Sequence, residues 1–422
     1  MSEQTAVAAV LAAVPTVRGW QEDLYRDLHR HPELSHQEHR TAALVAERLR
    51  QAGFDVTTGV GGTGVVGVMR NGEGPSVLLR ADMDALPVRE DTGLPYASTA
   101  TGTPVGEQTP VPVMHACGHD VHVSCLLGAA HLLAAGRSHW RGTLIALFQP
   151  AEETADGARG MVDDGLLTLT GPVDVALGQH VVPLPAGKLA ATPGPAMAAA
   201  DCIRITLYGR GGHGSMPQAT VDPVVLAAAI VLRLQTVVAR EVDPSEQAVL
   251  TVGSIHAGTK ANIIPDRAEL QLNIRSSNEA TRAAVLAAIR RVVRAECAAS
   301  NCPRDPDFEF FDQAPLTEND PAVTARVTEA FAAALGPETV VTPQRLMGSE
   351  DFSDIARGVS APYCFWLLGG ADLDAFLAAL AEGRTDVEIA VNHSPRFAPA
   401  IQPTLDTGTA ALVAAALAWL AG

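Results

Sequence analysis

The chain has 422 residues, of which 47% are hydrophobic and 18% charged, a composition typical of a globular protein large enough for two or three domains. Its 47 acidic and 30 basic side chains give a formal net charge of −17, which disfavours binding to polyanions. We therefore expect neither nucleic acid nor an anionic membrane as a partner. Six scattered cysteines in a chain of this size predict free thiols in a reducing compartment, and hence a cytoplasmic protein.

The first seventeen residues include an apolar stretch, TAVAAVLAAVPTV. Glu3 and the lack of Lys or Arg before this stretch argue against a secretory signal peptide. We find no apolar run in the sequence that reaches the roughly 18 residues that span a bilayer, so we expect no membrane segment.

The elements predicted next are helices and strands in alternation. Apolar side chains at helical spacing predict that the chain begins with a helical region over 18–52, which ends at Gly53. Strands are predicted at 64–69, 76–84, 142–150 and 174–180, and a helix at 122–136. Buried strands that alternate with helices predict an α/β fold with a mixed, mostly parallel sheet covered by helices on both faces.

A stretch rich in Pro and Gly, 181–197, precedes a second compact region. Its predicted elements are a strand at 201–208, a helix at 222–240, strands at 247–256 and 267–275, a helix at 278–299 and a strand at 307–311. This βαββαβ order predicts an inserted ferredoxin-like α+β domain. We expect a discontinuous domain formed by 1–192 and 312–422, and an inserted domain formed by 193–311. A further strand is predicted at 363–370.

Acidic and histidine side chains follow three of the predicted strands. They are Asp82 and Asp84, Glu152 and Glu153, and His180. Ligands of open α/β sheets gather at the carboxyl ends of the strands, so these side chains should lie together. The segment MHACGHDVH (114–122) adds Cys117 and His119 just before a predicted helix. Thiolate, imidazole and carboxylate together are what zinc and related divalent metals bind.

Each of these residues also has an ordinary structural role. A single Asp after a strand is usually a turn or cap residue, paired Glu side chains are usually solvated, and a lone Cys is usually a small buried apolar residue. Their joint occurrence favours a metal site, but spacing alone leaves His115, Asp120 and His122 equally eligible as ligands.

Two glycine-rich segments match the dinucleotide-binding pattern only in letters. GVGGTG (59–64) runs into another strand, and after GRGGHG (209–214) Pro217 intervenes before the helix begins. Neither places phosphate at a helix N-terminus, so we do not expect a nucleotide fold. The sequence also lacks the G-x-S-x-G motif of serine hydrolases.

Nine motifs in this order make the chain resemble the metal-dependent amidohydrolases of the aminoacylase–carboxypeptidase family. The resemblance is strongest to the branch of hippurate hydrolases, auxin-conjugate hydrolases and N-acetyldiaminopimelate deacetylases. The motifs are RHPELSHQE, LLRADMDALPV, MHACGHDVH, FQPAEETADGARGMVDDG, GQHV, GRGGHGSMP, KANIIPDRAEL, MGSEDFS and NHSPRF. They imply a zinc-peptidase-like catalytic domain, with the inserted domain as a lid and dimerisation domain.

The resemblance also implies roles for individual residues. The implied metal ligands are Cys117, His119, Glu153, His180 and His393. Glu152 matches the general base, Asp84 a residue that orients a ligand, and His213 a histidine that reaches the active site of a dimer partner. Asn262 and Arg275 match groups that hold the α-carboxylate of the substrate.

The implied activity is hydrolysis of the amide bond of N-acyl amino acids by one or two divalent ions per subunit, with Mn, Zn and Ni as candidates. The alternatives are a dipeptidase or carboxypeptidase, an N-carbamoyl amino acid hydrolase, and an inactive metal-binding scaffold. A homodimer or dimer-based oligomer is implied. The acyl group and the role of Glu350 and Asp351 are not readable from the sequence.

Overall fold

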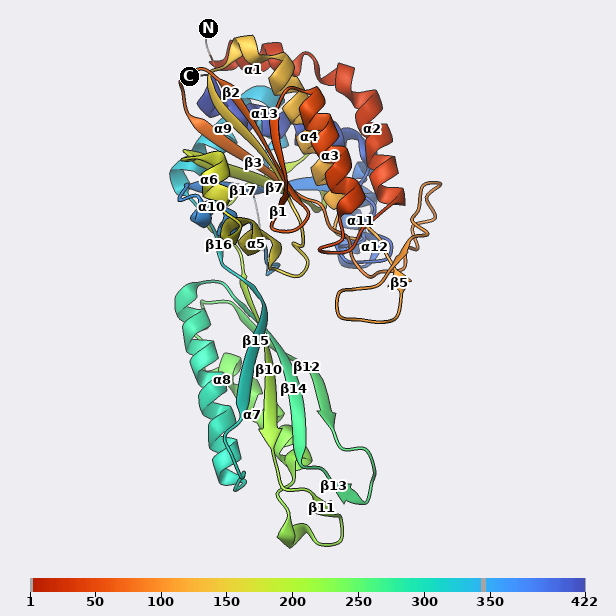
Figure 1. Ribbon diagram of the computed structural model, residues 1–422, viewed down its shortest axis with the longest axis vertical. Helices are drawn as coiled ribbons and strands as arrows, with labels where there is room; N and C mark the ends of the chain where they lie inside the picture. The colour runs from red at the N-terminus through yellow and green to blue at the C-terminus, as the bar shows by residue number, and fades with distance from the viewer. Residues whose placement is uncertain (1–2, 343–346, 422) are drawn as a thin grey trace. The chain divides into compact units, whose positions relative to one another are not determined.

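The computed structural model describes residues 3–342 and 347–421, which group into two compact units (Figure 1). The larger unit contains the residues up to Ala196, the segment that begins at Glu318, and the residues from Asp351 onward. The smaller unit contains Met197–Thr317 and the short segment that ends at Glu350.

A seven-stranded sheet forms the centre of the larger unit, in the order β1-β2-β6-β3-β7-β17-β8. The four middle strands run parallel, and antiparallel neighbours flank them at both edges. The strands are β1 (Asp55–Val60), β2 (Gly64–Asn71), β3 (Ser76–Asp82), β6 (Gly142–Gln149), β7 (Val175–Pro185), β8 (Leu189–Ala190) and β17 (Tyr363–Ala371). Every residue of β3 is buried, as expected for a parallel strand covered on both faces.

Helices cover the two faces of this sheet. Leu79 and Ala81 of β3 pack into one apolar core with the long helices α4 and α13, whereas Arg80 points the other way, with its guanidinium 5.9 Å from the centre of the Phe352 ring in α10. The helices are α1 (Glu3–Leu11), α2 (Val14–Arg30), α3 (His39–Gln51), α4 (His119–Ala135), α5 (Gly157–Asp163), α6 (Leu166–Thr170), α9 (Pro321–Leu335), α10 (Phe352–Gly358), α11 (Leu373–Ala381), α12 (Thr385–Glu388) and α13 (Ile401–Leu420). Short elements are β4 (Thr101–Gly102), β5 (Val111–Pro112), β9 (Gly194–Met197), β16 (Thr317–Asn319), η1 (Arg137–His139) and η3 (Pro337–Thr339).

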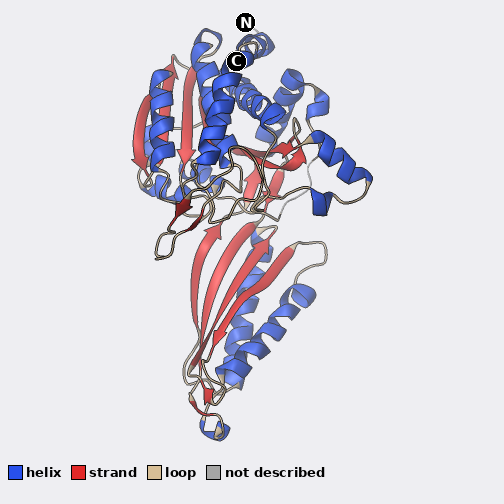
Figure 2. Ribbon diagram, turned by 90° about the vertical axis from the view of Figure 1, so that its right-hand side faces the viewer, coloured by secondary structure: helices blue, strands red, loops and turns tan. Residues whose placement is uncertain are grey.

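The smaller unit is a four-stranded antiparallel sheet in the order β12-β14-β10-β15, with helices α7 and α8 on one side (Figure 2). Its elements are β10 (Ala199–Tyr208), β11 (Gly212–His213), η2 (Pro217–Ala219), α7 (Pro223–Glu241), β12 (Ala248–Ala257), β13 (Ile263–Ile264), β14 (Arg267–Ser276), α8 (Glu279–Ala299) and β15 (Asp307–Ala314). Side chains of β14 alternate between buried and accessible, and the buried ones pack on the helices. This arrangement confirms the predicted ferredoxin-like fold.

Local sequence explains where the helices of the smaller unit begin. Asp222 caps α7 by accepting a hydrogen bond from the Val224 amide at 2.8 Å, and Pro223 occupies the first helical position. Asn278 caps α8 in the same way through the Thr281 amide.

Three expectations need correction. Residues 18–52 form two helices, because His31 precedes Pro32 and the chain leaves the helix for a loop at 31–38. Strand β7 continues to Pro185, so His180 lies within the strand rather than at its end. Helices α7 and α13 are long and apolar enough to span a membrane by those criteria alone, but 78% of the tested window of α13 is buried in the unit, and α7 buries one face in the core of the smaller unit.

Candidate metal centre

The sequence-predicted metal ligands of the larger unit lie close together. The Cys117 Sγ atom is 3.4 Å from Nε2 of His180, and Nε2 of His393 is 3.4 Å from a carboxylate oxygen of Glu153. Potential ligand atoms of Cys117, Glu153 and His393 all lie within 4.8 Å of one another. Four segments far apart in the sequence therefore bring sulfur, nitrogen and oxygen donors to one place.

A second group of possible ligand atoms shares Glu153 with the first. It consists of His119, Glu152 and Glu153, again within 4.8 Å. Nε2 of His119 lies 3.9 Å from Glu153 and 4.0 Å from Glu152. Glu153 thus belongs to both groups of possible ligand atoms.

Gly118 separates Cys117 from His119 and sets the start of α4. Its φ of +81° lies in the left-handed region, and a Cβ there would come 2.4 Å from a methyl carbon of Val181. Both observations require glycine between the two donor residues.

Asp84 fixes the ring of His119. One oxygen of Asp84 is 3.2 Å from Nδ1 of His119, and the other accepts hydrogen bonds from Ser35 Oγ at 2.7 Å and the Glu153 amide at 3.0 Å. The carboxylate therefore accepts a hydrogen bond from Nδ1–H of His119 and leaves Nε2 free of the proton on the side of the glutamates, as carboxylates do for metal-binding histidines.

His122 has its ring nitrogens occupied, which separates it from the candidate ligands. Nε2 of His122 accepts a hydrogen bond from the Val181 amide at 2.8 Å, so Nδ1 carries the proton and donates to Asp82. Asp82 also pairs with the buried Arg80 at 2.7 Å. Although Asp82 and His122 form a further potential group with His119 and His180, their partners leave them a supporting role.

The donor set fits divalent metal ions. Nε2 of His119 and one carboxylate oxygen of Glu153 are buried without a hydrogen-bond partner among the described residues. Burial raises the pKa of Glu153 to about 8, and burial together with the charges of Glu153 and Glu152 raises the pKa of Cys117 well above its usual range. A divalent cation offsets this accumulation of acidic groups, since thiolate and carboxylate ligands bind in their deprotonated forms.

Asn392 is a site residue that the sequence analysis missed. Its side-chain amide donates to the carbonyl oxygens of Cys117 at 3.3 Å and Val181 at 3.0 Å, and it lies 3.7 Å from the Cys117 sulfur. The next residue, His393, has a φ of +69° and donates its amide to the Ala116 carbonyl. Asn392 therefore anchors the loop that presents His393, and its place beside that histidine was the only available signal.

His29 of α2 is buried between two carboxylates, one of which, Asp120, follows the candidate ligand His119 in the sequence. Its Nδ1 is 2.7 Å from Asp120 and its Nε2 is 3.1 Å from Glu90, and the rings of Tyr25 and Tyr96 pack against it. Burial lowers the pKa of His29, but the hydrogen bonds to Asp120 and Glu90 outweigh burial and raise it to about 9. The resulting imidazolium connects α2 to the first turn of α4. The nearby His115 differs, because burial lowers its pKa to about 4.

The segment MGSEDFS contributes a buried anchor. Asp351 accepts hydrogen bonds from Gln149 at 2.6 Å and from the Ala158 amide at 3.1 Å, and it lies 3.3 Å from Arg80. It thereby joins the end of β6 to the start of α5.

A model of peptidase family M20/M25/M40 matches residues 78–393, a range that contains all five candidate metal ligands. The chain belongs to this family. Thermostable carboxypeptidase 1 of Saccharolobus solfataricus is 39% identical over 361 residues, which cover 84% of this chain and 87% of that protein. Hippurate hydrolase of Campylobacter jejuni is 36% identical over 352 residues, covering 83% and 88%.

Solved structures of the family have the same fold. The Bacillus subtilis YxeP protein, described as a dinuclear metal-binding peptidase of the M20 family, superimposes with a TM-score of 0.74 at 30% identity and covers 96% of this chain and 99% of that one. This member of the M20/M25/M40 family is thus a metal-dependent amidohydrolase with an α/β fold, as the sequence predicted.

The remaining sequence-predicted residues of this family member lie in the smaller unit, at two ends of its sheet. His213 pairs with Ile263 in the short β11–β13 ladder, and the Gly214 amide donates to the Asn262 carbonyl at 2.9 Å. Arg275 lies near the far end of β14, where it binds Asn273 at 3.0 Å and the Ser349 hydroxyl. Arg275 lies eight positions beyond Arg267 along the extended strand, about 26 Å, so one copy of the chain does not bring Asn262 and Arg275 together.

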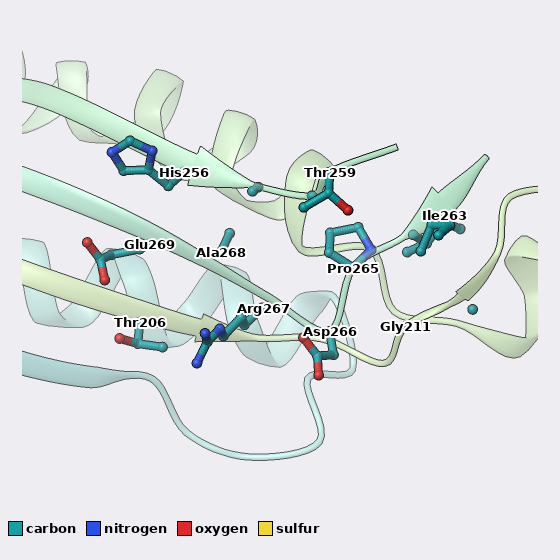
Figure 3. Close-up of a pocket in the computed structure, with 14 residues that line it drawn as sticks. Thr206, Gly211, His256, Thr259, Ile263, Pro265, Asp266, Arg267, Ala268 and Glu269 are labelled. Atoms are coloured by element: carbon teal, nitrogen blue, oxygen red, sulfur yellow. The ribbon is translucent and has the colours of Figure 1, made fainter. Parts of the chain in front are cut away.

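The end of the smaller unit near β11 and β13 is hollowed. A cavity of about 820 Å³ is lined by Thr206 of β10, His256 of β12 and Glu269 of β14, from three neighbouring strands (Figure 3). Gly212 and Ile263, the neighbours of His213 and Asn262, border it. The cavity holds no group of metal-ligand side chains among the described residues.

Proposed function

We propose that this protein hydrolyses the amide bond of N-acyl amino acids and releases a carboxylic acid and a free amino acid. The observation that carries the proposal is the adjacent pair Glu152 and Glu153. Glu153 belongs to both groups of possible ligand atoms, and Glu152 belongs to the second, 4.0 Å from His119. A purely structural or storage site for metal needs no second carboxylate in that place, which disfavours the inactive scaffold.

The proposed ligands are Cys117, His119, Glu153, His180 and His393, which would hold one or two divalent ions per subunit. The Cys117 sulfur and the three imidazoles favour Zn, and Mn or Ni are the other candidates. The chemistry that divalent ions supply in such a site is polarisation of a carbonyl group and acidification of water.

In this proposal Glu152 carries the proton. It accepts a proton from the attacking water and delivers it to the nitrogen of the leaving amine, while Asp84 keeps His119 in the tautomer that presents Nε2. His213 of a second copy donates a hydrogen bond to the oxygen that becomes negative in the transition state.

Arg275 is proposed to bind the α-carboxylate on the amine side of the scissile bond. Its planar guanidinium suits a carboxylate, and Asn273 and the Ser349 hydroxyl hold it in place. N-acyl amino acids and peptides with a free C-terminus both present such a carboxylate. A binding site for this carboxylate is compatible with similarity to both a carboxypeptidase and a hippurate hydrolase. The similarity to the carboxypeptidase makes peptide hydrolysis the second candidate function.

We also propose that the smaller unit is a lid and dimerisation domain, corresponding to the predicted insertion 193–311, and that the protein is a cytoplasmic homodimer. Two observations support the dimer. Strand β12 is at the edge of its sheet with one side unpaired, and the adjacent α7 exposes Val225 (65%) and Leu232 (74%). The separation of Asn262 from Arg275 also means that both can bind one substrate only if they come from different copies.

A substrate panel tests the function. Hippurate, N-acetyl amino acids, N-carbamoyl amino acids and dipeptides are incubated with the protein as isolated, after treatment with chelator, and after return of Zn, Mn or Ni. We expect N-acyl amino acids to be cleaved fastest and chelator to abolish the activity reversibly. Faster cleavage of dipeptides would select the second candidate, and activity in metal-free protein would contradict the whole mechanism.

A further inference from the structure

The side chains of the loop at 31–38 between α2 and α3 contact Asp84, the start of α5 and the turn that carries Glu152 and Glu153. Ser35 donates to Asp84 at 2.7 Å, His36 pairs with Asp156 at 2.9 Å, and Glu38 accepts a hydrogen bond from the Ala151 amide at 2.9 Å. These contacts join residues 49 to 120 positions apart in the sequence.

The turn that carries Glu152 and Glu153 has an unusual backbone. Ala151 and Ala155, on either side of the pair, have φ values of +51° and +54°, in the left-handed region that side chains other than glycine rarely adopt. Such a conformation persists only where the surroundings hold it. Within the turn, the Ala155 amide donates to the Glu152 carbonyl at 2.8 Å, but the Ala151 amide has its partner outside the turn, in Glu38.

Glu38 is built into this position. Its side chain is fully buried, one oxygen accepts from the amides of Ala151 and His36, and the other accepts from the Thr63 hydroxyl. Removing the carboxylate leaves a buried Ala151 amide without a partner, which disfavours the strained turn. Relaxation of that turn would redirect both neighbouring glutamates at once.

We propose that Glu38 is a positioning residue of the hydrolytic site. Its carboxylate holds Ala151 in the left-handed conformation, so that consecutive residues direct Glu152 and Glu153 to the same side, toward His119. This inference rests on the proposed function for its kinetic consequence, but its consequence for metal binding does not depend on any substrate.

The test uses three substitutions of Glu38. Glu38→Gln keeps an oxygen for the two amides, and the Thr63 hydroxyl can rotate to accept from the new NH₂ group. Glu38→Met keeps the shape of the side chain but removes the acceptor. Glu38→Asp keeps the charge and withdraws the acceptor by one methylene, and serves as the milder variant if the Met protein does not fold.

Glu33 provides the matched control. It lies in the same loop, and its carboxylate accepts from the amides of Arg40 and Thr41 at the start of α3, at 2.8 Å each, without contacting the Ala151 turn. Glu33→Met should lower the melting temperature through the helix start and leave the metal centre intact.

The readouts are affinity for Zn²⁺ by competition with a chelator, and kcat and KM at saturating metal. We expect Glu38→Met to weaken Zn²⁺ binding about 10- to 100-fold and to lower kcat about 100-fold with little change in KM. Glu38→Asp should show a smaller loss of the same kind, and Glu38→Gln should remain close to the wild type. Introducing Ala151→Gly into the Met variant should restore part of both losses, because glycine adopts the left-handed conformation without strain.

Two outcomes would overturn the inference: a Met variant that loses no more metal affinity and kcat than Glu33→Met, or a Gln variant as impaired as the Met variant. If the wild type hydrolyses none of the panel, the proposed function fails. In that case Zn²⁺ affinity alone decides whether Glu38 positions the turn.

Discussion

The two units of this chain hold their candidate functional residues in opposite ways. In the larger unit, Asp84, His119 and Glu153 are at most slightly accessible, and each makes contacts to at least one other member of the metal centre. In the smaller unit, His213 is exposed, and its ring accepts from the amide of Ser215, two residues away, and contacts the Ser215 hydroxyl. The sheets differ similarly, since helices cover both faces of the seven-stranded sheet but only one side of the four-stranded sheet.

In the proposed mechanism, the larger unit supplies the groups for metal binding and proton transfer. In the same mechanism, the smaller unit supplies the exposed His213 to a second copy of the chain. Its accessible apolar side chains on α7 and the unpaired edge of β12 have the same character. The following predictions test that division of roles, from the largest expected effect to the smallest.

The largest loss of activity is expected from a substitution of Glu152 in the larger unit. Glu152→Gln removes the proton acceptor without removing a proposed ligand, so we expect kcat to fall about 1,000- to 10,000-fold while metal content, measured by elemental analysis, stays unchanged. Loss of metal from this variant would indicate that Glu152 is a ligand, and unchanged turnover would refute its role in proton transfer.

Removal of Arg275 tests the role of the smaller unit in binding. For Arg275→Ala we expect KM to rise about 10- to 100-fold with kcat less affected, because a charge-assisted hydrogen bond to the substrate carboxylate is lost. Arg204→Ala is the control, since Arg204 is an arginine of the same sheet that pairs with Glu309 at 2.8 Å. Equal KM values for the two variants would contradict the assignment.

Mixed dimers test whether His213 of the smaller unit acts in the metal centre of a second copy of the chain. His213→Ala and Glu152→Gln chains are each inactive in this mechanism, but a dimer of one and the other contains one intact site out of two. Coexpression of the two chains with different tags should therefore restore about a quarter of the wild-type activity per site, since half of the dimers are mixed.

If His213 serves its own chain, the mixture stays inactive. Pairing the His213→Ala chain with a chain that carries both substitutions is the control, because no intact site can form in that mixture.

A buried charged side chain in each unit predicts a smaller effect, a difference in how the free energy of unfolding depends on pH. The pKa of His29 is about 9 in the folded protein against 6.5 for a free imidazole, so its stabilising interaction is complete below pH 6.5 and disappears as pH rises through 9. The difference in stability between wild type and His29→Gln should thus shrink by about 3 kcal/mol between pH 6.5 and 9.5 in urea unfolding curves.

Arg282 of the smaller unit is the comparison for His29. It pairs with the buried Asp201 at 2.7 Å, and hydrogen bonding to Asp201 raises its pKa further above its usual, already high range. The destabilisation caused by Arg282→Gln should therefore be constant over the same pH range. Parallel curves for the two variants would show that His29 is neutral in the folded state.

Most of the fold follows from local patterns in the sequence. The strands at 64–69 and 142–150 and the whole βαββαβ order were predicted because burial and periodicity are local signals. The division of 18–52 into two helices was missed, although Pro32 is a local signal for it.

The metal centre was predictable in kind but not in its selection of residues. His122 could not be separated from His119 by spacing, since its exclusion depends on the Val181 amide, 59 residues away. The role of Glu38 depends on a left-handed alanine 113 residues away, and His393 was found only by resemblance. The sequence shows donor types, whereas the tautomer and orientation of each donor are set by tertiary partners.

The short two-stranded sheet of β9 and β16 has a consequence for the history of the chain. The polypeptide departs along β9 into the smaller unit and returns along β16, and Asn319 binds the Thr192 carbonyl at 2.9 Å where the two meet. Because β9 and β16 are paired, the ends of the larger unit's chain on either side of the smaller unit lie side by side, and a few residues could connect them. The intervening residues therefore add little to the entropic cost of closing this loop. Exchange of the segment between β9 and β16 would therefore leave the chain of the larger unit continuous, so that in the proposed mechanism substrate preference and assembly could change while the metal ligands stay the same.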